Sequence, residues 1–313
     1  MDYSLVTYSD LPQLDPDDVF LANELAKRGY QCQPLIWNDP HADWANAGCA
    51  VIRSTWDYHL YYDQFLSWVK RVSAVTRLVN ESPLVEWNSN KKYLQDLEAC
   101  GVPIVPTHWL SAVEAKAEAR DEVTQAAGRT CPATKDGASN FNLGAILLQH
   151  QWSRAVIKPC IGLATFGVEM IALTDEGIKS GLKHIEKLST AGDIMIQPYI
   201  ASVQTHGERA LVYFKGEFSH AVRKTAFQPL RPAGRAGEEA VVAERDEIEL
   251  GEKAIETVVS IVGKLPNYAR VDVVRDEQQK PLVMELELVE PSLFLSMHEK
   301  AAARFADALL QMS

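Results

Sequence analysis

The chain has few cysteines, and they are not grouped. Five cysteines are scattered over 313 residues, with no CxxC pair and no cluster of histidine and cysteine. An odd, dispersed set supports neither a disulfide framework nor a zinc site. The small disulfide-rich and zinc-dependent classes are therefore excluded.

Long apolar runs and clusters of positive charge are also missing. No stretch of about 18 apolar residues occurs, and the N-terminus lacks the basic start and apolar core of a signal peptide. Acids outnumber bases 42 to 31, giving a formal net charge of −11, and no run of lysine and arginine reverses it locally. Because such a field repels polyanions, we expect a cytoplasmic protein that binds neither membranes nor nucleic acid.

In residues 1–86, predicted strands alternate with a predicted helix. The strands are expected at 3–8, 31–37 and 50–53, and the helix at 17–28, ending before Gly29. This alternation indicates a parallel α/β unit. Ligands of such sheets bind beyond the carboxyl ends of the strands, so we interpret residues 1–86 as a substrate-side domain.

The segment that leaves the third of these strands combines a cation, a hydroxyl, an indole and an acid. These side chains belong to Arg53, Ser54, Trp56 and Asp57. Such a mixture suits a small zwitterionic substrate. An ordinary loop is the alternative.

Residues 87–313 are expected to contain further helices and strands. Residues 87–90 are expected to cap a helix at about 91–100, and further helices are expected at about 111–125, 175–189, 245–264 and 298–311. Strands are expected at 155–158, 167–171, 194–197, 210–214, 217–220 and 268–274 and within 283–291, with a Lys-Gly hairpin turn at 215–216 and a flexible excursion at 128–142. The whole is an α/β chain with α+β elements.

Three features of this part are suited to a nucleotide. Lys158 ends a strand and precedes a small-residue turn that contains Gly162 and Gly167, where backbone amides could approach phosphate oxygens. Lys91 lies at the expected start of a helix, where anions are favoured. The extended segment Gln197 to Ile200, which includes Tyr199, could read an adenine edge with its backbone. Taken singly, a hairpin turn and a surface lysine explain the first two.

Three acids lie on two neighbouring predicted strands. Glu285 and Glu287 are two residues apart and so point to one face, and Asp272 lies on the strand before. Carboxylate oxygens grouped in this way suit Mg²⁺ or Mn²⁺ better than zinc. The alternative is an edge strand with a glutamate in solvent.

The order of these features resembles the ATP-grasp superfamily from Lys91 to the C-terminus. The phrases at 53–58, 87–94, 218–224, 268–272 and 284–291 are similar to the branch that includes prokaryotic glutathione synthetase and D-cycloserine synthetase. The resemblance implies an N-terminal α/β domain followed by two α+β subdomains, 87–196 and 197–313, that clasp ATP. It also implies a small amino-acid-like substrate and leaves a homodimer open.

The resemblance also implies a role for each matching residue. Lys91 and Lys158 would hold the phosphates under the turn from Gly162 to Gly167, residues 197–200 would bind adenine, and Glu208 would serve the ribose. Arg223, with Lys224 beside it, would steady the transferred phosphoryl group. The metal ligands would be Asp272, Glu285 and Glu287, binding Mg²⁺ or Mn²⁺. Relatives often carry an Asp-Phe-Arg phrase that is missing here. Either Arg231 or Arg235 would replace its arginine, or the substrate differs.

The implied activity is ATP-dependent ligation of a carboxylate to an amine through an acylphosphate, with release of ADP and phosphate. The two groups would belong to two molecules or to one, as in cycloserine formation. A dipeptide ligase, a small-molecule kinase and a non-catalytic nucleotide sensor are the alternatives. His206 and His220 are near the site in sequence, either as a base or as ordinary polar contacts.

Overall fold

The computed structural model describes residues 2–116, 141–163, 165–225 and 237–311. Its elements form two compact units, Met1–Ile104 with Ala201–Ser313, and Val105–Ile200. The described residues contain three sheets, one parallel and two antiparallel. The mixed α/β class is confirmed. Short 3-10 helices occur at Trp44–Asn46, Tyr58–Leu60, Ala201–Gln204 and Leu295–Met297.

The first sheet is parallel, with the order β2-β1-β3-β4. Its strands are β1 (Tyr3–Thr7), β2 (Cys32–Ile36), β3 (Cys49–Ser54) and β4 (Arg77–Val79), with helices α1 (Asp18–Lys27) and α2 (Tyr62–Ser73). Alternate residues of β1 serve opposite faces: Leu5 belongs to the core with α1, whereas Val6 belongs to the core with α2. The predicted parallel α/β unit is confirmed.

The five-stranded sheet of the same unit is antiparallel, with the order β11-β10-β9-β12-β13. Its strands are β9 (Glu208–Phe214), β10 (Glu217–Lys224), β11 (Glu238–Val241), β12 (Tyr268–Arg275) and β13 (Pro281–Glu287). The predicted hairpin turn is confirmed, because Lys215 and Gly216 both have positive φ, 50° and 81°. Helix α8 (Arg245–Val262) packs on one face, where Gly251 leaves room for the Tyr213 hydroxyl.

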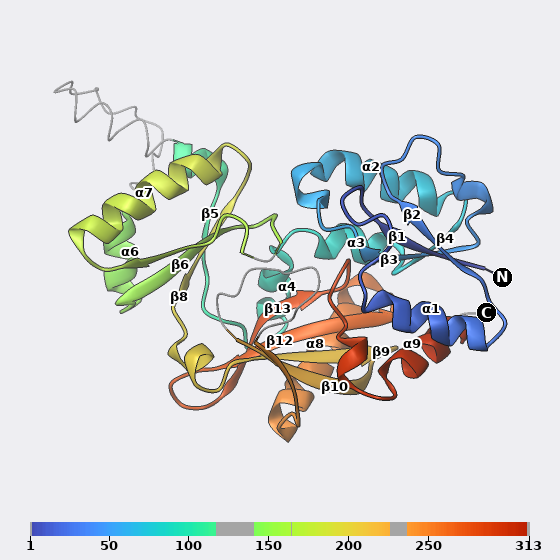
Figure 1. The fold of residues 1–313 in the computed structure, drawn as a ribbon. Helices are drawn as coiled ribbons and strands as arrows, with labels where there is room; N and C mark the ends of the chain where they lie inside the picture. Colours follow the sequence, from blue (N-terminus) through green and yellow to red (C-terminus); the bar gives the residue numbers. More distant parts are fainter. Residues whose placement is uncertain (1, 117–140, 164, 226–236, 312–313) are drawn as a thin grey trace. The chain divides into compact units, whose positions relative to one another are not determined.

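A shared core joins these two sheets. Phe305, on α9 (Ala301–Leu310), stacks on Phe214 of β9 with ring centroids 4.9 Å apart. Helices α1 and α9 lie side by side (Figure 1), and Arg28 Nη2 is 2.8 Å from Asp307 Oδ1. The buried hydroxyl oxygen of Tyr268 lies 2.8 Å from the carbonyl oxygen of Ile52 and 2.9 Å from that of Val289. The first strands of the chain are thereby tied to its last third.

Two short helices lie near Lys91, and the expected cap is confirmed in part, because Asn90 Oδ1 accepts a hydrogen bond from Lys92 N at 3.0 Å. Residues 87 and 88 end helix α3 (Ser82–Asn88) instead of capping the next one, and α4 (Tyr93–Ala99) begins two residues later than predicted. The Asn88 side chain instead pairs with β13 and its continuation, donating to Leu286 O at 2.8 Å and accepting from Leu288 N at 2.7 Å. This tertiary contact overrides the capping preference of asparagine.

The smaller unit is a four-stranded antiparallel sheet with the order β5-β8-β6-β7. Its strands are β5 (His108–Leu110), β6 (Arg154–Pro159), β7 (Glu169–Ala172) and β8 (Ile194–Pro198). Helices α6 (Leu143–Gln149) and α7 (Asp175–Ser189) pack together beside it. The predicted helix at 111–125 is described only to residue 116, and most of the excursion at 128–142 lies outside the described residues.

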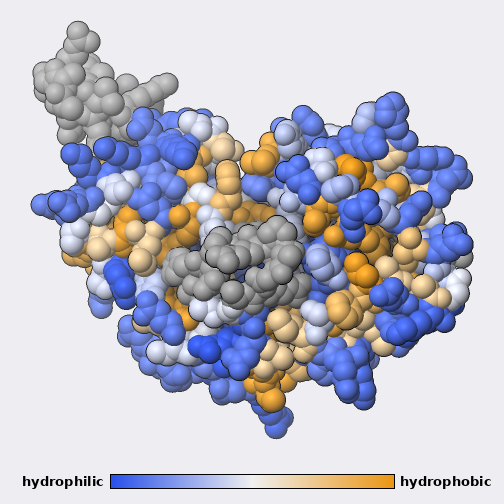
Figure 2. Space-filling model, in the orientation of Figure 1, coloured by the Kyte–Doolittle hydropathy of each residue, from blue (hydrophilic) through white to orange (hydrophobic). Residues whose placement is uncertain are grey.

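Hydrophilic and hydrophobic residues are mixed on the visible surface (Figure 2). Large exposed apolar side chains include Phe20, Leu148 and Val242, and scattered residues of this kind are normal. Within the described part of the chain, no helix has both the length and the apolar character needed to span a membrane.

Candidate active site

The three predicted metal-binding acids meet on β12 and β13. The antiparallel register pairs Asp272 with Glu285 and Arg270 with Glu287. One carboxylate oxygen from each of Asp272, Glu285 and Glu287 lies within 4.8 Å of the others. Asp272 is fully buried and the two glutamates are half-buried. Strand pairing thus brings three oxygen ligands to one place.

Three cations lie against these acids. Arg270 Nε is 2.9 Å from Asp272 Oδ1, and Arg270 also contacts Glu287. Lys224 Nζ is 2.7 Å from Asp272 Oδ2 and also contacts Glu208. The third cation, Lys91, places Nζ 2.7 Å from Glu285 Oε1. The cluster therefore joins side chains of β9, β10, β12 and β13 with Lys91, which lies just before α4. All of them belong to the larger unit.

Arg270 is the member that the sequence prediction missed. It lies two residues before Asp272 on the same strand, so the two side chains point to one face. The same two-residue rule had linked Glu285 with Glu287, and it would have identified Arg270 as well.

The charged groups of the cluster shift one another's pKa values. Burial alone would raise the pKa of Asp272, but Arg270 and Lys224 hold it well below its ordinary range. Burial raises the pKa of Glu287 to about 7, against the opposing charge of Arg270 and with added repulsion from Glu285. For Lys224, burial lowers the pKa, and Asp272 and Glu208 more than reverse that effect. The charge of Glu287 is thus less well compensated than that of Asp272.

The donor set fits a divalent cation. Glu290, which is buried three residues beyond Glu287, has a pKa raised by burial and then by repulsion from Glu287. Among the described residues, five acids then face three cations; with all five acids ionised, the excess is two negative charges, which one Mg²⁺ would balance. The members are Glu208, Asp272, Glu285, Glu287 and Glu290 against Lys91, Lys224 and Arg270. Hard carboxylate oxygens are the ligands that Mg²⁺ and Mn²⁺ prefer.

The structure does not bring Arg223 to the acids. In the β9–β10 pairing, Lys224 lies opposite Glu208 and Arg223 lies opposite Arg209, on the other face. The Arg223 guanidinium donates to main-chain carbonyls, to His206 O at 3.1 Å and to Thr205 O at 2.9 Å. The adjacent Lys224 is the residue of this pair that reaches Asp272.

The predicted adenine and phosphate residues that follow residue 104 lie in the smaller unit. The β6–β8 register pairs Lys158 with Met195 and Val156 with Gln197, so Lys158 and Gln197 share a sheet face. The Tyr199 amide donates to Arg154 O at 3.0 Å, and Arg154 lies over the Tyr199 ring at 4.1 Å.

The extended segment ends with Ile200, which is the last residue of the unit. At the other end of the predicted nucleotide site, Gly162 is buried and Gly167 has a φ of +65°. The turn is therefore tight where the chain returns to β7.

The predicted substrate residues near β3 differ in their surroundings. Arg53 and Ser54 are buried and both contact Asp18, with Arg53 Nε 2.8 Å from Oδ1 and Ser54 Oγ 2.7 Å from Oδ2. Asp57 accepts a hydrogen bond from Trp37 Nε1 at 2.7 Å. These contacts hold all three side chains in place.

Trp56 points toward the acid cluster, because its indole nitrogen is 3.4 Å from the main-chain oxygen of Glu290. Arg231 and Arg235 lie outside the described residues.

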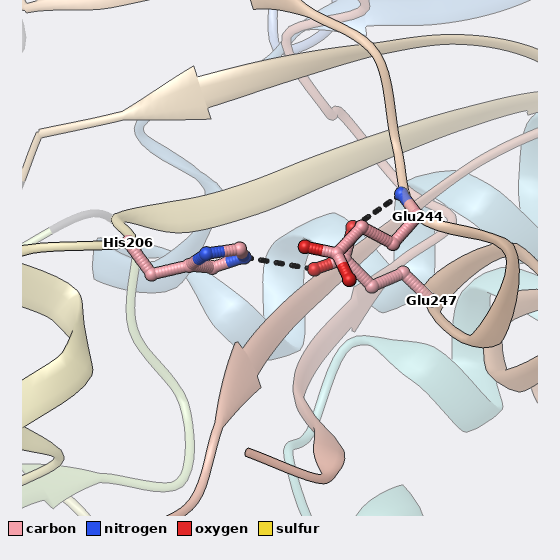
Figure 3. A group of neighbouring side chains, drawn as sticks. All are labelled: His206, Glu244 and Glu247. Carbon is pink, nitrogen blue, oxygen red and sulfur yellow. Dashed lines mark hydrogen bonds and ion pairs between the residues drawn. The ribbon is translucent and has the colours of Figure 1, made fainter.

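A second group of possible metal ligands lies at the start of α8 (Figure 3). His206 Nε2 is 2.9 Å from Glu247 Oε1, and Glu244 closes the group. Two arginines already supply positive charge: Arg275 Nε is 3.2 Å from Glu247 Oε1, and Arg209 Nε is 3.2 Å from His206 Nε2. We interpret this group as an ion network that anchors α8 to β12.

Solved structures place the fold in the ATP-grasp class. A RimK-domain ATP-grasp protein from Sphaerobacter thermophilus matches with a TM-score of 0.62 and 15% identity, covering 98% of both chains. The ATP-grasp ligase PsnB, solved with a precursor variant, Mg and ADP, matches with a TM-score of 0.59 and 15% identity, covering 99% of this chain and 98% of PsnB. The predicted ATP-grasp fold is confirmed.

The family is defined by closer likenesses. Residues 4–80 match the family model described as the N-terminal domain of D-cycloserine synthetase DcsG. The cycloserine biosynthesis protein DcsG of Streptomyces lavendulae is 33% identical over 318 residues, covering 98% of this chain and 97% of that protein. A crystal structure of D-cycloserine synthetase DcsG matches with a TM-score of 0.83 and 31% identity, covering 100% of this chain and 99% of that one. The chain belongs to the DcsG family and is an ATP-dependent ligase.

Proposed function

We propose that this ligase activates the carboxylate of a small amino-acid-like substrate as an acylphosphate, then joins it to an amine with release of ADP and phosphate. Ring closure within one molecule, of the cycloserine type, is the proposed reaction because the DcsG likeness covers nearly the entire chain. The observation that carries the proposal is the buried cluster of Asp272, Glu285 and Glu287 with Lys91, Lys224 and Arg270.

The chemistry follows from the weakness of a carboxylate as an electrophile. A substrate carboxylate oxygen attacks the γ-phosphorus of ATP, and ADP leaves. The amine nitrogen then attacks the acyl carbon, phosphate leaves, and the nitrogen loses a proton. Positioning and charge stabilisation supply most of the catalysis of such transfers, so a nucleophilic side chain is not required.

Within this cluster, each cation has a proposed task. Lys91 would leave Glu285 and hold ATP phosphate. Arg270, in place of Arg223, would stabilise negative charge on the transferred group, because it already lies against two of the three acids. Lys224 would hold Asp272 and Glu208 in position. Asp272, Glu285 and Glu287 would hold Mg²⁺, which when bound would neutralise and orient the ATP phosphates.

The remaining ATP contacts are proposed for the smaller unit, with Glu208 of the larger unit serving the ribose. Gln197, Tyr199 and Ile200 would bind adenine, and Lys158 with the turn from Gly162 to Gly167 would bind phosphates. These proposals rest on the strand positions described above. We also propose three domains, 1–86, 87–196 and 197–313.

The substrate is proposed to be a zwitterion that meets Trp56 and Glu290. Glu290 is buried and, among the described residues, has no ion-pair partner within 4.0 Å, so an ammonium group would complement it. Arg53 Nη1 is also buried without a hydrogen-bond partner in the described part of the chain. We further propose Ser54, Asp57 and one of Arg231 and Arg235 as supporting residues, and a homodimer as the assembly.

The test is product analysis with the purified chain, ATP, Mg²⁺ and a set of amino-acid-like carboxylates. The ligase predicts ADP and phosphate only when a substrate is present, and hydroxylamine should trap the activated acyl group as a hydroxamate. AMP with pyrophosphate would contradict the mechanism. A stable phosphorylated product would identify a kinase, and a product that joins two amino acids would identify a dipeptide ligase. Nucleotide binding without turnover would identify a sensor.

A further inference from the structure

Strand β13, which carries Glu285 and Glu287, is the last strand of its sheet. It ends the order β11-β10-β9-β12-β13, so β12 pairs with one of its edges and leaves the other, the outer edge, to different partners. Leu286 and Leu288, which flank Glu287, are both buried. Buried main-chain groups need hydrogen-bond partners. The groups that supply these partners therefore determine how firmly the outer edge is held.

The side-chain amide of Asn88 takes the place of a neighbouring strand at this edge. Its Nδ2 donates to Leu286 O at 2.8 Å, and its Oδ1 accepts from Leu288 N at 2.7 Å. A residue of a parallel strand makes the same two contacts, with the carbonyl before its partner residue and the amide after it. Here the residue between the two contacts is Glu287. One amide thus holds the main chain on both sides of Glu287.

The hydroxyl of Tyr93 makes a third contact on the outer edge. Leu286 N donates to Tyr93 Oη at 2.9 Å, and this amide belongs to the peptide bond that joins Glu285 to Leu286. Burial raises the pKa of Tyr93, and the charge of Glu285 raises it further, so the hydroxyl stays neutral beside the acids. Both main-chain groups of Leu286 are therefore fixed by side chains, the carbonyl by Asn88 and the amide by Tyr93.

The two side chains are themselves held in the protein. Asn88 is the last residue of α3 and Tyr93 is the first residue of α4, and they are 6% and 2% exposed. Trp87 packs against the Tyr93 ring, with ring centroids 5.3 Å apart. On its other edge, β13 pairs with β12. The part of β13 that carries the glutamates is therefore held from both edges.

We propose that Asn88 and Tyr93 are positioning residues for metal binding: by holding the outer edge of β13, they fix the direction in which Glu285 and Glu287 present their carboxylates. The inference rests on the proposed function, in which these glutamates bind Mg²⁺. Both carboxylates point to one face of the strand, so a shift or rotation of β13 would move them together. Groups that orient metal ligands typically contribute about 10- to 100-fold to metal affinity.

Two variants remove these contacts with little change in side-chain volume. Asn88→Leu removes both contacts of the amide, and Tyr93→Phe removes the hydroxyl and keeps the ring. Without nucleotide, we expect Mn²⁺ affinity to fall about tenfold or more in Asn88→Leu and about threefold in Tyr93→Phe. Tyr213→Phe is the matched control, because Tyr213 is buried on β9 of the same sheet and its hydroxyl donates to Ile248 O at 3.1 Å. This control should lose similar stability and keep the wild-type affinity.

Titration of free Mn²⁺ by electron paramagnetic resonance measures the affinities, and urea unfolding measures the stability of each variant. Wild-type affinity in either folded variant would overturn the inference alone, and so would an equal loss in Tyr213→Phe. If Asn88→Leu does not fold, the comparison of Tyr93→Phe with Tyr213→Phe decides. Glu285→Gln identifies the site that is titrated, because it should weaken Mn²⁺ binding by itself. Wild type that binds no Mn²⁺, or Glu285→Gln that binds it as tightly as wild type, would overturn the proposed metal site as well.

Discussion

Lys91 Nζ lies 2.7 Å from Glu285 Oε1, which pairs a proposed phosphate ligand with a proposed metal ligand. Burial lowers the pKa of Lys91, and Glu285 more than offsets this. The lysine therefore stands where a metal ion would compete with it. Nucleotide that draws Lys91 away would free Glu285, so metal and nucleotide binding should strengthen each other.

The first prediction concerns this pair. Without nucleotide, Lys91→Met should bind Mn²⁺ about fivefold more tightly than wild type, because Glu285 loses its competing ammonium group. Titration of free Mn²⁺ by electron paramagnetic resonance measures the affinity. Lys264→Met is the control, since it breaks a surface pair of the same 2.7 Å length with Glu81. Equal affinities of Lys91→Met and wild type would refute the competition.

The second prediction tests the metal ligands. Glu285→Gln should lower ADP release about 100-fold or more, because a neutral amide removes charge from the proposed Mg²⁺ site. Glu277→Gln, in the exposed turn between β12 and β13, should retain wild-type turnover. Substrate-dependent ADP release measures both. Retained activity in Glu285→Gln would remove that residue from the site.

The third prediction compares two arginines. Arg270→Lys should lower kcat about 100-fold, because lysine cannot reproduce the guanidinium contacts with Asp272 and Glu287. Arg223→Lys should lower it much less, since that guanidinium binds main-chain carbonyls on the opposite sheet face. Steady-state kcat and KM for ATP separate the two. The reverse order of effects would restore Arg223 to the catalytic role.

The fourth prediction concerns stability and pH. Burial, with repulsion from His298, lowers the pKa of His220 to about 4. The neutral ring fits its contacts, because Nε2 donates to Leu293 O at 3.1 Å and Nδ1 accepts from Ser219 Oγ at 3.0 Å. The unfolded chain binds this proton near pH 6.5, so folded stability is lost as the pH falls from about 6.5 to 4, by about 3 kcal/mol in full.

Urea unfolding between pH 7.5 and 4 measures this loss. The free energy of unfolding should fall less steeply in His220→Asn than in wild type. His41→Asn, at an exposed loop position, should follow the wild-type curve. Parallel curves for His220→Asn and wild type would show that another group carries the pH dependence.

Local periodicity made much of the fold predictable. The short, largely apolar runs of β1 and β3, buried along their whole length, and the span of α7, Asp175–Ser189, follow from local sequence patterns. Helix α2 was missed although Phe65, Trp68, Val69 and Val72 have helical spacing. The position of Asn88 was not predictable, because its preference for a helix cap is overridden by β13, almost 200 residues away.

The candidate site was predictable where the alternation of side chains along a strand decides which residues share a face. This alternation places Glu285 and Glu287 on one face, and it places Arg223 and Lys224 on opposite faces of β10. Ion pairs between distant segments, such as Lys91 with Glu285, depend on tertiary folding and leave no local pattern. The contact between the Tyr93 hydroxyl and the amide of Leu286 likewise joins a side chain to a backbone group, which sequence patterns do not encode.

The division of the chain also sets an order for its synthesis. The smaller unit, Val105–Ile200, is continuous, whereas the larger unit needs both Met1–Ile104 and Ala201–Ser313. On the ribosome, the first sheet emerges long before Tyr268 and Phe305, which complete its core. Until then the N-terminal segment is incompletely packed, with Leu5, Leu21 and Val51 partly exposed. The smaller unit can complete its folding first. Nascent chains stalled before β12 should expose this apolar surface to chaperones.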